Sequence, residues 1–77
     1  MTHPHLAIWI AHVADVLTSD HNATDYDATA DYAANLLTAY PYLVTSADAY
    51  AHGAMELADF RQAVTFAVSD NDHNGGF

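Results

Sequence analysis

The sequence predicts an all-α fold, a small three-helix bundle that is followed by a disordered acidic tail. Apolar residues recur at helical spacing in three segments, turn and capping residues separate these segments, and small polar residues dominate the end of the chain. A chain of 77 residues can form one domain with a thin core. We therefore expect one helical domain over residues 1–68 and a disordered tail over residues 69–77.

The first helix is predicted from His5 to Ser19, where the apolar residues share one arc at about 100° per residue. Trp9 lies within this arc and is expected to be a structural core residue, whereas Ile8 falls on the polar side. The arc is close to 180° wide, which is more than a small bundle needs. Homodimerisation through Trp9, Val16 and Ile8 would bury the surplus.

The second helix is predicted to begin at Thr24, because Thr24 and Asp27 have the spacing of a capping box, and to end near Tyr40, before Pro41. Its outer face carries Asp27 and Asp31. An acidic residue in the first turn also suits the helix dipole.

The third helix is predicted from Thr45 to about Val68, since Thr45 and Asp48 again have capping-box spacing. Gly53 is a structural residue at which this helix would kink or split. The predicted core of the three helices consists of Leu6, Trp9, Ile10, Val13, Leu17, Leu37, Leu57, Phe60 and Val64.

Arg61 is expected to have a structural role. It has no acidic residue three or four positions away on its own helix, so it lacks a local ion-pair partner. We expect it to reach across the bundle to an aspartate of the second helix.

Nine aspartates, one glutamate, one arginine and no lysine give the chain a formal net charge of −9. The negative electrostatic field of such a charge keeps a protein soluble, and a basic partner can also recognise it. Compositional drift and adaptation to high salt are alternative explanations of the acidity. Direct nucleic-acid binding is disfavoured, because phosphate neutralisation needs lysine and arginine.

Enzymatic activity is not expected, because no glycine-rich phosphate cradle, HExxH pair or pair of glutamates at helical spacing occurs. We expect no cofactor. The chain has no cysteine and no set of ligands typical of a structural zinc site, so we also expect no metal centre. His3 and His5 leave weak transition-metal binding open. No apolar segment resembles a signal peptide or a membrane span, so we expect a cytoplasmic protein.

The predicted binding surface combines acidic and apolar residues on the solvent faces of the second and third helices. Carboxylates three or four positions apart on a helix lie about 5 to 6 Å apart, a spacing comparable with that of DNA backbone charges. In size and charge the chain resembles the DNA mimics with which phages inhibit restriction, CRISPR or transcription proteins. The alternative is a self-associating structural or adaptor module. The predicted partner-binding residues are Asp27, Asp31, Asp48, His52, Met55, Glu56, Asp59 and Phe66.

Overall fold

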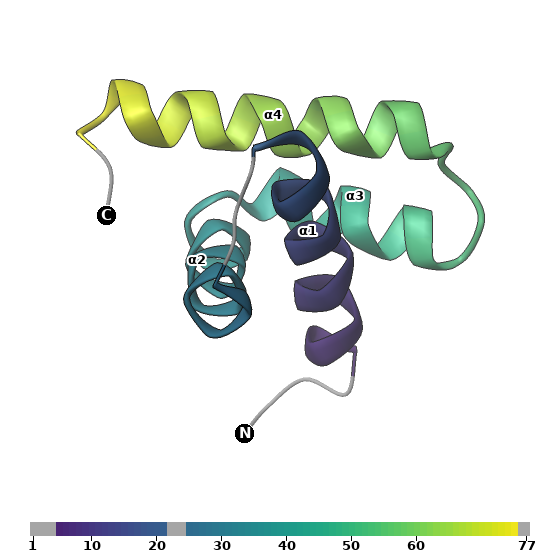
Figure 1. Cartoon of the computed structure of the whole chain (residues 1–77). Coiled ribbons are helices and arrows are strands. Elements are labelled where there is room, and N and C mark those ends of the chain that lie inside the picture. The colour runs from purple at the N-terminus through teal and green to yellow at the C-terminus, as the bar shows by residue number, and fades with distance from the viewer. Residues whose placement is uncertain (1–4, 22–24, 76–77) are drawn as a thin grey trace.

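The protein is all-helical, as the sequence predicts, but it has four helices where three were expected. The computed structural model describes residues 5–21 and 25–75. This part of the chain contains α1 (Leu6–Asp20), α2 (Tyr26–Ala39), α3 (Pro41–Ala51) and α4 (Leu57–His73), and no strand. Figure 1 shows α4 lying across one side of the other three helices, with α3 running antiparallel beside it.

The predicted third helix is two helices, and Gly53 separates them. Gly53 has φ of +75°, a left-handed conformation that glycine adopts more readily than other residues. The Gly53 amide donates to the Tyr50 carbonyl at 3.1 Å, and the Ala54 amide donates to the Ala49 carbonyl at 2.8 Å. This pair of hydrogen bonds is a Schellman motif, so α3 ends through a glycine C-cap.

The predicted caps differ from those in the structure. Asp25, and not Thr24, caps α2, and its side chain accepts a hydrogen bond from the Ala28 amide at 3.2 Å; Thr24 lies outside the described residues. Pro41 is the first residue of α3, a position at which its missing N–H leaves no hydrogen bond unmade. The predicted start at Thr45 is therefore wrong, because Thr45 lies inside α3.

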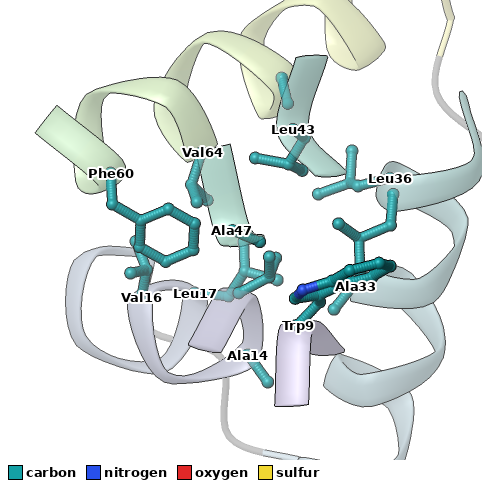
Figure 2. Close-up of a cluster of buried hydrophobic side chains, with 13 residues drawn as sticks. Trp9, Ala14, Val16, Leu17, Ala33, Leu36, Leu43, Ala47, Phe60 and Val64 are labelled. Carbon is teal, nitrogen blue, oxygen red and sulfur yellow. The ribbon is translucent and has the colours of Figure 1, made fainter. Parts of the chain in front are cut away.

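All four helices contribute to one hydrophobic core (Figure 2). Phe60, Leu36 and Leu43 are among its largest fully buried side chains. Figure 2 shows Phe60 and Val64 of α4 facing the side chains of the other helices. The buried apolar residues are Trp9, Val13, Ala14, Val16, Leu17, Ala33, Leu36, Leu37, Leu43, Ala47, Phe60, Val64 and Ala67.

One predicted core residue is not in the core. Leu57 is 48% exposed, whereas most of the other predicted core residues are buried and Leu6 and Ile10 are partly buried against the core. Leu57 is the first residue of α4, directly after the α3–α4 turn. Leu57 lies three and seven positions before Phe60 and Val64, on the same side of α4, so its exposure reflects its place in the first turn of the helix and not its position around the helix axis. Ile8 is 45% exposed, in agreement with its position on the polar side.

The predicted disordered tail is also wrong over residues 69–73, which form the last turns of α4. Asn71 is 4% exposed, and its side-chain amide donates to the Tyr32 hydroxyl at 3.1 Å. Because Asn71 follows Phe60, Val64 and Ala67 at helical spacing, it extends the buried stripe of α4 with a paired polar group.

None of the helices in the described part of the chain has both the length and the apolar character that crossing a membrane requires.

A matched pair of leucine truncations tests this core. Leu36→Ala removes a side chain that is 0% exposed, and we expect it to lower the free energy of unfolding by about 2–5 kcal/mol. Leu57→Ala makes the same change at an exposed site, so its effect should be within about 0.5 kcal/mol. Urea unfolding followed by circular dichroism measures both. A Leu57→Ala variant as unstable as Leu36→Ala would contradict the arrangement of α4.

Candidate functional site

The carboxylates lie at the surface, and most have no cation beside them. Only Asp20 and Asp48 are half-buried among the acidic residues, and the rest are exposed. In residues 5–21 and 25–75, an ion pair joins Asp20 to Arg61, and the His52 imidazole lies next to the Asp48 carboxylate. The remaining carboxylates therefore present unneutralised charge to the solvent.

The predicted binding residues do not form one surface. Asp27 and Asp31 are exposed on α2, whereas the other six lie on α3, α4 or the turn between them. Figure 1 shows α2 on one side of the molecule and the α3–α4 turn on the opposite side. A partner that contacts all eight residues would thus have to wrap around the protein.

Met55 and Phe66, the two apolar residues of the predicted binding surface, have different environments. Phe66, on α4, is 57% exposed. Met55 is partly buried and packs against the core, so its truncation would lower the stability of the fold. The exposed position expected for Met55 is not observed, because the turn after Gly53 directs the chain back over the core.

Asp48 and His52 are paired at the end of α3. The His52 Nδ1 atom lies 3.4 Å from the Asp48 carboxylate and 2.8 Å from the Asp48 carbonyl oxygen. The imidazole of His5 lies 6.2 Å away, edge-on to that of His52. In the described residues no three or more histidine, cysteine, aspartate or glutamate side chains come together in a way that could hold a metal ion. His3 lies outside the described residues.

The outer face of α4 places Phe66 among polar and acidic residues. Asp59 lies seven positions before Phe66 and Asp70 lies four positions after it, so the three share one side of the helix. The Tyr42 hydroxyl donates to the Asp70 carboxylate at 3.4 Å. Partial burial of the Tyr42 hydroxyl, together with this carboxylate, raises the pKa of Tyr42. We call Asp59, Gln62, Phe66 and Asp70 the outer face of α4.

Arg61 pairs with Asp20 of α1 and not with an aspartate of the second helix, so that prediction is corrected. Its Nε and Nη2 atoms donate to the two carboxylate oxygens at 2.8 and 2.7 Å, the bidentate geometry of a strong ion pair. The guanidinium holds the pKa of Asp20 below its usual range, and Asp20 in turn raises the pKa of Arg61. The absence of a local partner correctly indicated a long-range contact.

A groove of about 490 Å³ opens between α1 and α4, with Tyr50 of α3 in its wall. The Arg61–Asp20 pair contributes to its lining. No sequence pattern indicated this groove, because it depends on how α1 crosses α4. The lining residues are His12, Asp15, Val16, Ser19, Asp20, Tyr50, Leu57 and Arg61.

The residues predicted for self-association are mostly internal. Trp9 and Val16 are 8% and 4% exposed and belong to the core. The wide apolar arc of α1 therefore packs largely within the chain. Of the three predicted dimer residues, only Ile8 remains at the surface.

Comparison with known proteins finds no family model that matches the sequence, and no match among curated proteins or solved structures.

The pH dependence of stability tests the role of the Arg61–Asp20 pair. The pKa of Asp20 is lowered from 3.8, so the pair stabilises the fold above the pKa of the unfolded state and this contribution disappears as pH falls through the lower, folded pKa. We expect Asp20→Asn to melt at a lower temperature than the wild type at pH 7, and the difference to vanish in strong acid.

Asp15→Asn is the matched control, because it makes the same change on α1 at an exposed residue that lacks an ion pair in the described part of the chain. It should not lower the melting temperature at pH 7, since it removes one repelling charge. A difference between Asp20→Asn and the wild type that stays constant from pH 7 to strong acid would refute the role of the pair.

Proposed function

We propose that this protein inhibits a basic, nucleic-acid-binding protein by presenting carboxylates where the partner would otherwise bind DNA phosphates. The observation that carries the proposal is the set of exposed carboxylates that form no ion pair within residues 5–21 and 25–75, on a chain of net charge −9. A phage-type inhibitor of host defence or transcription proteins, acting in the cytoplasm, fits this surface. This negative charge repels phosphate groups and favours a lysine- or arginine-rich cleft.

The outer face of α4 is the best candidate for the docking surface, since it combines charge with an exposed aromatic side chain. Asp59 and Asp70 are eleven residues apart and therefore about 16 Å apart along the helix axis. Carboxylates held this far apart on one helix can pair with two separate cations of a cleft that otherwise contacts DNA phosphates. Phe66 between them supplies apolar contact area, which complementary charges alone do not provide.

Asp27 and Asp31 on α2 contribute differently. They lie on another side of the molecule and cannot contact a partner that covers only the outer face of α4. Their charge nevertheless adds to the field that draws a basic partner to the protein. We therefore expect them to affect the rate of encounter more than the lifetime of the complex.

Displacement by DNA tests the mimicry itself. The immobilised protein is used to capture proteins from a bacterial lysate, and the bound fraction is challenged with a short duplex DNA or with the same concentration of a neutral polymer. We expect duplex DNA to release the captured partner, because both ligands use one basic cleft. A partner that duplex DNA cannot displace, or that does not bind nucleic acid, would contradict mimicry.

Two variants with equal changes in charge separate the two acidic groups. Asp59→Asn with Asp70→Asn should weaken binding of the captured partner about tenfold or more, whereas Asp27→Asn with Asp31→Asn should mainly slow association and do so less at high salt. Biolayer interferometry at two salt concentrations measures both rates. Equal effects of the two variants at both salt concentrations would mean that only net charge matters.

The apolar anchor is tested by Phe66→Ala. Phe66 is exposed, so its truncation should leave the free energy of unfolding within about 0.5 kcal/mol while speeding dissociation about tenfold or more. Met55→Ala is the contrasting variant, because Met55 packs against the core and its loss should chiefly lower stability. Unchanged dissociation of the Phe66→Ala variant would remove Phe66 from the interface.

A further inference from the structure

The groove between α1 and α4 has a mixed lining that fits one kind of ligand. Its volume of about 490 Å³ is within the range of small-molecule sites, about 300–1,000 Å³. Val16 and Leu57 supply apolar surface, and Leu57 is 48% exposed because it lies in the groove wall and not in the core. An apolar wall beside charged residues suits a ligand with an aliphatic stem and a polar head.

The charges of the lining favour a cation. Arg61 donates from Nε and Nη2, which form one edge of its guanidinium, to the two oxygens of Asp20 at 2.8 and 2.7 Å, so Arg61 and Asp20 neutralise each other. Asp15 remains as an exposed carboxylate with no ion pair in the described residues. An anion would meet two carboxylates and one engaged guanidinium, whereas a cation finds one free carboxylate.

The aromatic end of the groove is held in place by packing. Tyr50 stacks on Phe60 with ring centroids 4.8 Å apart and planes at 3°, and the His12 ring stands edge-on to Tyr50 at 4.9 Å. Phe60 is 0% exposed, so it anchors Tyr50 to the core. A wall that is already ordered loses little conformational entropy when a ligand binds. An aromatic ring in the lining also favours a cationic head group.

We propose that this groove receives a single basic side chain, with Asp15 pairing its charge and Leu57 and Val16 contacting its aliphatic stem. The inference deepens the proposed function and rests on it for the source of that side chain, a lysine or arginine of the basic partner. Lysine and arginine share the required features, a stem of methylene groups and a cationic end.

Small probes test the groove without the partner. The full chain, labelled with ¹⁵N, is titrated with n-butylammonium, n-propylguanidinium and butyrate at constant ionic strength, and amide shifts are followed by NMR. We expect saturable shifts at Asp15, Ser19 and Leu57 with the two cations, and none with butyrate. The better cation indicates whether lysine or arginine is the natural occupant. Shifts spread evenly over all acidic residues, or saturable shifts with butyrate, would overturn the proposal.

Two matched variants assign the contacts. Asp15→Asn should weaken cation binding about fivefold, the upper range for an exposed ion pair, whereas Asp31→Asn makes the same change on α2, away from the groove, and should leave binding unchanged. Leu57→Ala should weaken binding of both cations while keeping their order. Equal affinity of the wild type and the Asp15→Asn variant would exclude the assigned role of Asp15.

This experiment and the DNA-displacement experiment can fail separately. If the groove does not bind the probe cations but duplex DNA still displaces the partner, the outer face of α4 remains as the proposed docking surface. If the groove binds the probe cations but duplex DNA does not displace the captured partner, the basic side-chain site is retained and DNA mimicry is refuted.

Discussion

The one arginine of the chain forms a bidentate ion pair that links α4 to α1. Arg61 joins α4 to the last residue of α1 through two short hydrogen bonds to Asp20. A carboxylate at the C-terminal end of a helix is unfavourable, because it lies at the negative end of the helix dipole, and the guanidinium offsets this. Since the chain has no lysine and no second arginine, no other acidic side chain can pair with such a cation; Asp48 lies beside His52, and Asp70 accepts a hydrogen bond from Tyr42.

The shortage of cations leaves apolar packing to stabilise the fold. A domain of this size buries a modest share of its surface, and mutual repulsion of the carboxylates opposes compaction. The core opposes this repulsion with fully apolar side chains, such as Leu36, Leu43 and Phe60, each 0% exposed. Trp9 and Val16 belong to this core as well, so the wide apolar arc of α1 needs no second copy of the chain. A thin core and an unneutralised surface therefore follow from one composition.

Periodicity predicted the helical class, much of the core and the break at Gly53, because these depend on local spacing and on the conformational freedom of glycine. It failed where the outcome depends on contacts between helices. The amide of Asn71 can be buried because the Tyr32 hydroxyl accepts its hydrogen bond, Leu57 is exposed in the first turn of α4, and Arg61 pairs with an aspartate of α1. The same limit applies to function: exposed acids on α2 and α4 could be predicted, whereas the groove arises only from the way α1 crosses α4.

The two proposed contact surfaces belong to one helix, and its geometry explains how. Leu57 and Phe66 are nine residues apart, which at about 100° per residue places them on opposite flanks of α4. Phe60 and Val64 lie between these flanks and face the core (Figure 2). One flank therefore closes the groove with α1, and the other presents Phe66 between Asp59 and Asp70. A basic partner that inserts one side chain beside Leu57 would have to extend around α4 to reach Phe66, so a cleft that grips the helix from two sides fits this protein better than a flat basic surface.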